Sequence, residues 1–140
     1  MLLAVPAWAQ PGERDVALCQ PFVNAALTAE DLRGDWPYTR FTATGDTYRG
    51  CLRMDARGAG VNRVEYFAGR ERRVVEFDVT AQVQGDRVVF EGRGPARHLV
   101  GGGSYAVDHF TCAAVPQGFS CAHEDAAGTV DPDFTLRRLP

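Results

Sequence analysis

Hydrophobic and polar residues alternate strictly along a stretch in the middle of the chain. From Val75 to Val83 every second residue is apolar, and the residues between them are charged, hydroxyl-bearing or amide-bearing. A period of two residues is typical of a β-strand that buries one face and exposes the other, as strands of antiparallel sheets often do. The pattern therefore predicts an antiparallel strand over this stretch.

A second strand is expected directly after it. Gly85 and Asp86 suit a tight two-residue hairpin turn, and the run "RVVFEGRG" that follows is again rich in Val and Phe. A slip of one residue in this pairing would expose Phe90 to water, so turn and pattern specify one register. The predicted pairs are Val83 with Val88, Ala81 with Phe90 and Val79 with Gly92 on the buried face, and Gln84 with Arg87, Thr80 with Glu91 and Asp78 with Arg93 on the wet face.

Runs of Val, Phe, Tyr and Thr between Gly-, Asp- and Asn-bearing turns predict further strands. The Gly- and Pro-rich region 92–103 is instead expected to form the longest loop. About eight short strands predict an all-β fold, either a small antiparallel β-barrel or a β-sandwich. The additional strands are expected at residues 38–43, 47–55, 61–67, 104–115, 119–124 and 133–138.

A short helical N-terminal segment is expected before the sheet. Apolar residues recur at helical spacing between Val16 and Leu27. Thr28 and Asp31 then resemble a capping box, and Gly34 is placed to end the turn.

The approach to the first strand carries a short motif. Residues Leu32 to Trp36 read L-x-G-D-W. Together with the strand count, this motif resembles the lipocalins. The resemblance favours a lipocalin-like barrel of about eight strands over the sandwich.

The first nine residues, MLLAVPAWA, look like the end of a signal peptide. An apolar run ends in Ala7-Trp8-Ala9, which has small residues at the two positions that cleavage requires. We predict that residues 1–9 are a remnant of a signal peptide and that residues 10–140 form a single β-rich domain. The protein is then expected to be periplasmic or secreted.

The four cysteines fit disulfides better than a metal site or a redox pair. No C-x-x-C or zinc-knuckle spacing is present, and export favours oxidation of an even set of cysteines. A four-residue loop from Val115 to Gly118 would place Cys112 directly opposite Cys121, within bridging distance. We predict this bridge and, by elimination, a second bridge between Cys19 and the outward-facing Cys51.

The sequence carries no recognisable catalytic or metal-binding motif. The glycines before Ser104 lack the G-x-S-x-G context, and the acidic residues after His123 lack calcium-loop spacing. A net charge of −3 does not favour nucleic-acid binding, and no segment approaches the roughly 20 apolar residues of a membrane span. We therefore expect a non-enzymatic monomer without metal or cofactor.

Two binding functions are compatible with this architecture. The first is a module that holds a small apolar ligand inside the barrel, and the second is an envelope protein-interaction or inhibitor module that acts through its loops. A cavity with apolar walls would favour the first. The predicted ligand-lining residues are Tyr48, Leu52, Phe77, Val79, Phe90 and Phe110. The residues predicted to contact an anion or a partner from the long loop are Arg93, Arg97 and His98.

Overall fold

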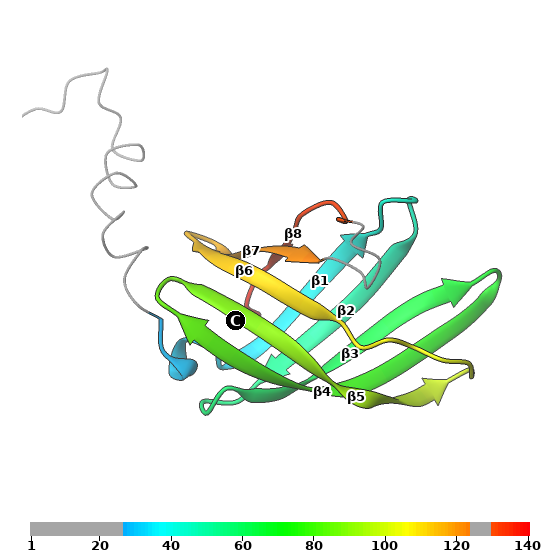
Figure 1. The fold of residues 1–140 in the computed structure, drawn as a ribbon, viewed down its shortest axis with the longest axis horizontal. Coiled ribbons are helices and arrows are strands. Elements are labelled where there is room, and N and C mark those ends of the chain that lie inside the picture. Colours follow the sequence, from blue (N-terminus) through cyan, green and yellow to red (C-terminus); the bar gives the residue numbers. More distant parts are fainter. Residues whose placement is uncertain (1–26, 124–129) are drawn as a thin grey trace, which may run out of the picture.

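The structure, a computed structural model, describes residues 27–123 and 130–140 as one eight-stranded sheet. The strands follow one another in chain order, and each pairs antiparallel with the next (Figure 1). They are β1 (Gly34–Phe41), β2 (Thr47–Met54), β3 (Ala59–Ala68), β4 (Glu71–Gln84), β5 (Arg87–Val100), β6 (His109–Val115), β7 (Gly118–His123) and β8 (Phe134–Leu136).

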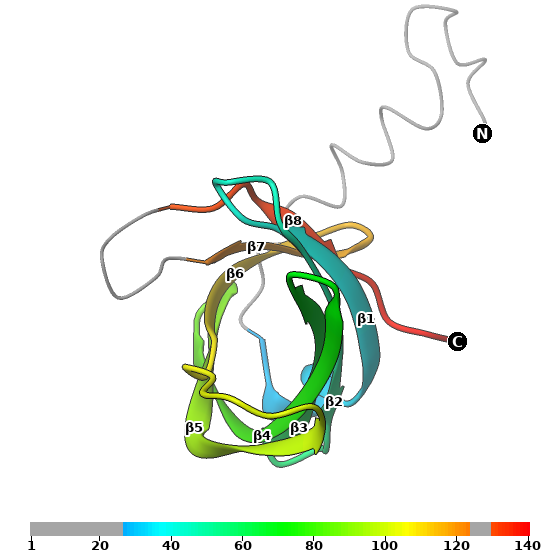
Figure 2. The same ribbon diagram turned by 90° about the vertical axis from the view of Figure 1, so that its right-hand side faces the viewer.

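The sheet curls into a nearly closed barrel. After β8 the chain returns to β1, where the Leu139 N–H donates to the Asp35 carbonyl over 2.9 Å. Figure 2 looks into the barrel from the end at which β1, β3, β5 and β7 finish. The prediction of an all-β antiparallel barrel is confirmed, and a single continuous sheet takes the place of the two sheets that a sandwich would need.

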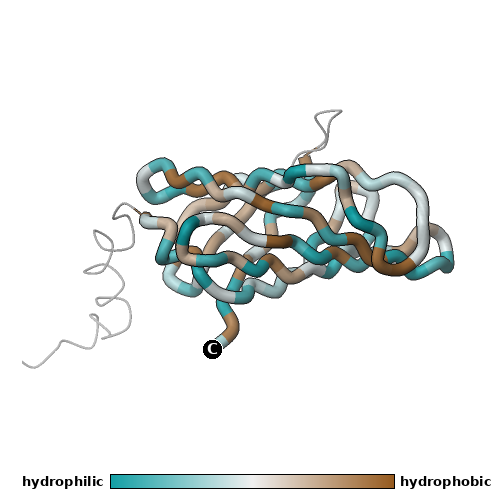
Figure 3. Tube along the Cα trace, turned by 90° about the horizontal axis from the view of Figure 1, so that it is seen from below, coloured by the Kyte–Doolittle hydropathy of each residue, from teal (hydrophilic) through white to brown (hydrophobic). Residues whose placement is uncertain are grey.

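Most side chains inside the barrel are apolar because the strands alternate in the predicted phase. The alternation of hydrophilic and hydrophobic residues is visible along the chain trace (Figure 3). All six predicted pairs of the β4–β5 hairpin occur, including Val83 with Val88 and Asp78 with Arg93. One side-chain contact differs from expectation, because Asp78 accepts from Arg97, while Arg93 donates to Thr80.

The predicted loop at 92–103 is wrong, because β5 continues to Val100. Its pairing with β4 shifts register near Gly94 and Pro95, and its pairing with β6 stops at Glu91. Pro95 therefore sits in an irregular stretch that lacks a neighbour on one side, where a missing N–H breaks no ladder. The irregular connection is residues 101–108, so β6 begins at His109 instead of Ser104.

The N-terminal helix is not confirmed in the described chain, which has only a 3-10 turn, η1 (Ala29–Leu32). The expected capping interaction is present, since the Thr28 N–H donates to the Asp31 carboxylate. Trp36 donates to the Leu32 carbonyl over 2.8 Å, and both side chains are buried, so this turn covers one end of the barrel. The predicted signal-peptide remnant at 1–9 and the segment 10–26 lie outside the described residues.

The β6–β7 hairpin has the predicted register. Cys112 lies opposite Cys121 with their Cα atoms 4.1 Å apart, and the two form a disulfide inside the barrel. The predicted four-residue loop is wrong in length, because Val115 pairs with Gly118 and leaves a two-residue turn. Cys51 faces outward as expected and has no disulfide partner among the described residues, and Cys19 lies outside them.

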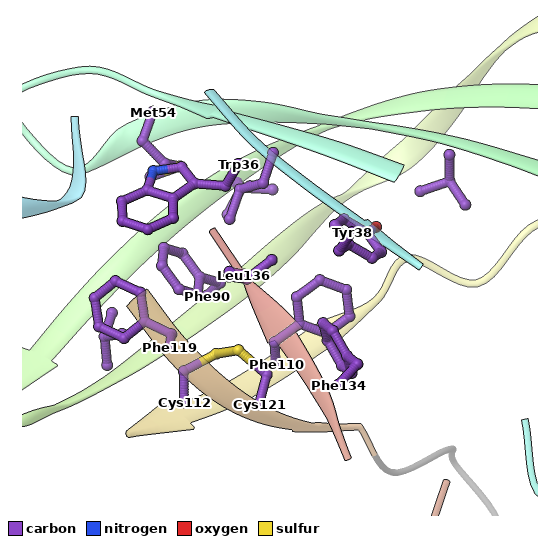
Figure 4. Packing of buried hydrophobic residues seen from close by; sticks show 14 of the residues in the cluster. Trp36, Tyr38, Met54, Phe90, Phe110, Cys112, Phe119, Cys121, Phe134 and Leu136 are labelled. Carbon is purple, nitrogen blue, oxygen red and sulfur yellow. A yellow bond between two sulfur atoms is a disulfide. The ribbon is translucent and has the colours of Figure 1, made fainter. Parts of the chain in front are cut away.

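The core fills the half of the barrel next to η1. Aromatic rings pack edge to face or tilted around the disulfide, with ring centroids 4.8 to 6.2 Å apart (Figure 4). These geometries and the complete burial of the rings are those of a close-packed interior. The rings that surround the disulfide are Trp36, Tyr38, Phe90, Phe110, Phe119 and Phe134.

Candidate functional site

A cavity of about 880 Å³ opens at the end of the barrel opposite η1. It forms where β5 and β6 separate, and the 101–108 connection runs along its mouth (Figure 2). We call it the open-end cavity. Its lining residues are Arg40, Thr42, Ala43, Thr44, Tyr48, Tyr66, Arg73, Ser104, Tyr105, Ala106, Val107, Asp108, His109, His123 and Asp131.

The polar residues of the open-end cavity continue the inward-facing rows of the core. On β1, Arg40 follows Trp36 and Tyr38 at every second position, and on β7, His123 follows Cys121. Since side chains two residues apart share a face of a strand, these polar groups must point inward. Arg73 on β4 and Tyr66 on β3 extend their rows in the same way, ahead of Val75 and after Val64.

Three tyrosines form an aromatic wall of the cavity. Tyr48 and Tyr66 stack with their ring planes 8° apart and their centroids separated by 5.4 Å. Tyr105 packs against Tyr66 at 5.2 Å and reaches back to Phe77 at 6.1 Å. The wall therefore joins the apolar core to the cavity and offers flat aromatic surface.

A buried ion-pair network forms a second wall. The Arg40 side chain is only 2% exposed, and its Nη1 lies 3.0 Å from Asp131 and its Nη2 3.4 Å from Asp108. Its guanidinium group also lies 4.7 Å from the centre of the Tyr48 ring. Such a charge is stable inside a barrel only because carboxylates and an aromatic face replace water around it.

His123 bridges the two carboxylates of this network. Its Nδ1 lies 2.7 Å from Asp131 and its Nε2 3.3 Å from Asp108, so both ring nitrogens face acceptors. An imidazolium donates from both nitrogens, and the protonated form balances Arg40 and His123 against two carboxylates. Hydrogen bonding to Asp108 raises the pKa of His123, although burial and the Arg40 charge oppose this.

Asp131 and Tyr105 have protonation states that fit this charge balance. Burial favours neutral Asp131, but the Ala43 N–H and His123 outweigh it and lower the pKa of that carboxyl. Burial and the Asp108 charge raise the pKa of Tyr105, whose hydroxyl donates to Asp108 over 2.5 Å. Asp131 is therefore a carboxylate that accepts hydrogen bonds.

Arg73 lies at the mouth of the cavity, beneath the glycine-rich connection. A Cβ atom at Gly103 would come within 2.6 Å of the Arg73 guanidinium, and Gly103 has a φ of +97°. Only glycine adopts this backbone conformation freely and leaves space for the arginine. Arg73 has one exposed ion-pair partner, Glu71, whose carboxylate lies 3.3 Å from Nη2.

Three buried side-chain polar atoms within the described residues have no hydrogen-bond partner. They are Arg40 Nε, the Tyr66 hydroxyl and Arg73 Nε, and all three residues line the open-end cavity. Buried polar groups are almost always paired, so their concentration in one place makes the cavity the candidate functional site.

The sequence-predicted lining residues separate into two groups. Tyr48 lines the cavity, whereas the other five pack into the filled part of the barrel. Their role in ligand binding stays a prediction. The five core residues are Leu52, Phe77, Val79, Phe90 and Phe110.

The predicted loop cluster of Arg93, Arg97 and His98 lies on exposed positions of β5 and does not line the open-end cavity. Arg97 is held by two acidic side chains of β4, Glu76 at 3.3 Å and Asp78 at 3.1 Å. In the described segments no group of three or more His, Cys, Asp or Glu side chains is arranged to hold a metal ion. None of their helices has the length and apolar character to span a membrane.

Fold and cavity together define a small antiparallel β-barrel that is filled at one end and hollow at the other. No family model matches the chain, and no curated protein matches it. The chain is similar to a solved structure described as a redesigned beta barrel, with a TM-score of 0.51 and 15% sequence identity. The match covers 83% of this chain and 100% of that chain, and at this identity it supports the barrel fold alone.

Proposed function

We propose that the protein is a non-enzymatic binding module that holds a small planar molecule in the open-end cavity. The observation that carries this proposal is the cavity itself, about 880 Å³ in volume, with a stacked tyrosine wall and the orphaned polar atoms. Ligand sites are typically concave spaces of 300–1,000 Å³ with mainly apolar walls and a few polar groups that orient the ligand.

The composition of the cavity changes the expected ligand. The sequence alone suggested an apolar ligand deep in the barrel, but that region is occupied by packed side chains. Aromatic rings on one wall and charged groups on the other favour a molecule with a flat ring system and polar substituents. We therefore place the ligand near Tyr48, Tyr66 and Tyr105.

We further propose that the protein is exported and lipocalin-like in its mode of binding. The Cys112–Cys121 disulfide supports export, because such bonds persist mainly in oxidising compartments. The L-x-G-D-W motif at Leu32 to Trp36 and the ligand cavity at one end of the barrel support the lipocalin-like character.

An NMR titration with a panel of planar aromatic compounds tests the binding function. Compounds that bind should shift the resonances of Tyr48, Tyr66 and Tyr105. Tyr48→Ala should weaken their binding because it removes one ring of the stacked pair. Phe67→Ala is the control, because Phe67 is 58% exposed on the outer surface. If no planar compound shifts the cavity resonances, the proposal is wrong.

A second candidate function is docking to an envelope protein through the open end. Six large hydrophobic residues in the described chain are exposed, and five of them lie at the ends of β1, β3 and β5 or beside the end of β7. Exposed apolar patches often mark interaction sites. The five exposed residues at this end are Phe41, Phe67, Leu99, Val100 and Val130.

A photo-crosslinker at position 67 tests this second function. It should capture one defined partner, and Leu99→Ser should abolish capture without changing small-molecule binding.

A further inference from the structure

We infer that the ligand of the open-end cavity is an aromatic monocarboxylate whose carboxylate binds Arg73 and the Tyr66 hydroxyl. This inference rests on the proposed binding function and names the chemistry of its ligand.

Arg73 and Tyr66 provide two donors at one place. Among residues 27–123 and 130–140, no acceptor is paired with Arg73 Nε or with the Tyr66 hydroxyl, and Tyr66 is only 7% exposed. The two groups are neighbours, since Tyr66 on β3 pairs directly with Arg73 on β4 and both side chains line the cavity. An anionic acceptor between them would satisfy both donors with charge-assisted hydrogen bonds.

The other arginine of the cavity does not offer a comparable anion site. Arg40 already faces Asp108 and Asp131, and an incoming anion there would meet two carboxylates. In the described part of the chain the one carboxylate that Arg73 faces is that of Glu71, whose side chain is 54% exposed and therefore well solvated. The electrostatic difference orients the ligand with its charged end toward Arg73 and away from the Arg40 network.

The single positive charge at Arg73 favours a ligand with one negative charge. One arginine and one hydroxyl balance a carboxylate, whereas a phosphate dianion would need a second free cation. The ring of the ligand would then pack beside Tyr66 and Tyr48, which both line the cavity next to the anion site. The inferred ligand therefore combines a planar ring system with a single carboxylate.

Isothermal titration calorimetry with 2-naphthoate and 2-naphthamide tests this inference. The two compounds have the same ring system and nearly the same shape, and they differ in charge. We expect 2-naphthoate to bind at least about tenfold more tightly, as charge-assisted hydrogen bonds to a partly buried arginine require.

Three variants locate the carboxylate. Arg73→Met should remove the preference for naphthoate and leave naphthamide binding within about twofold, and Tyr66→Phe should reduce the preference in part. Arg93→Met is the matched control on the outer wall and should leave both affinities unchanged. Circular dichroism measures whether each variant is folded. If Arg73→Met does not fold, Tyr66→Phe still tests the inference.

The outcomes separate the two proposals. Equal binding of naphthoate and naphthamide, or a preference that survives in both Arg73→Met and Tyr66→Phe, overturns the inference and leaves the binding function standing. A preference lost in Arg93→Met overturns it as well. Absence of binding for both compounds, together with no response in the NMR panel, overturns the binding function itself.

Discussion

The two ends of the barrel use the same strands for different purposes. At the η1 end, β1 contributes Trp36 and β7 contributes Phe119, whose rings pack 5.2 Å apart in the core. A few residues further along, the same two strands contribute Arg40 and His123, which face each other across the cavity wall. The ends differ in the side chains of the inward rows and in pairing, because β5 and β6 separate at the open end.

This difference separates stability from the proposed binding function. Complete burial of aromatic rings stabilises the filled half, because it removes apolar surface from water. In the open half, burial of Arg40, Asp108 and Asp131 costs desolvation energy that the ion pairs offset. We therefore expect substitutions in the filled half to change stability most, and substitutions at the cavity mouth to change ligand affinity most.

Phe90→Ala should have the largest effect. Phe90 is fully buried beside Phe119, and removal of a core phenylalanine costs about 3–5 kcal/mol of unfolding free energy. Urea denaturation measures it, with Phe67→Ala as an exposed control that should change stability by less than about 0.5 kcal/mol. A loss below about 1 kcal/mol for Phe90→Ala would show that the η1 end is not tightly packed.

Arg40→Met should be nearly as costly, at about 3 kcal/mol of unfolding free energy. Breaking a buried ion pair leaves uncompensated charge, and His123 remains to balance only one of the two carboxylates. The double variant Arg40→Met with Asp131→Asn restores charge balance and should be more stable than the single variant in the same denaturation experiment. If it is not, charge balance is not what stabilises the open half.

Loss of the disulfide should cost somewhat less, roughly 2.5 kcal/mol. The bridge closes a short loop, with a sequence separation of 9, so it restricts the unfolded chain only moderately. Thermal unfolding of Cys112→Ala/Cys121→Ala should match that of the reduced wild-type protein. A reductant that leaves the wild-type melting temperature unchanged would contradict a bridge between these cysteines.

The pH dependence of stability should be the smallest effect. The pKa of His123 is raised in the folded protein, so its contribution is fully present below its unfolded pKa of about 6.5. Stability should fall as the pH rises through the higher folded pKa, because the buried network then loses a positive charge. Denaturation between pH 6 and pH 9 measures the fall, and His123→Gln should flatten it. An equal fall in the variant would assign the effect to another group.

Much of the barrel could be predicted from local patterns. The alternation from Val75 to Val83 and the turn at Gly85 were sufficient for the register of the β4–β5 hairpin, and a short loop after Ala114 was sufficient to place Cys112 opposite Cys121. The register holds although the loop has two residues instead of four, because both loops have the same centre and inward orientation depends on neighbouring residues alone. The alternation along β1, β4 and β7 also indicated the cavity, because Arg40, Arg73 and His123 occupy inward positions of these strands. The prediction of the ligand site did not use these three residues.

Only the tertiary structure decided where the site lies. Arg40 meets Asp108, His123 and Asp131 across 68 to 91 residues of sequence, and no local pattern encodes contacts of that separation. Likewise, β5 can continue through Gly94 and Pro95 because its pairing with β6 ends at Glu91. These two residues therefore have no β6 partner whose hydrogen bond a proline would break. The sequence by itself determined which faces of the strands are dry, because that depends on a period of two residues. The closure of the barrel determined which inward-facing polar groups meet, because it brings the first and last strands together.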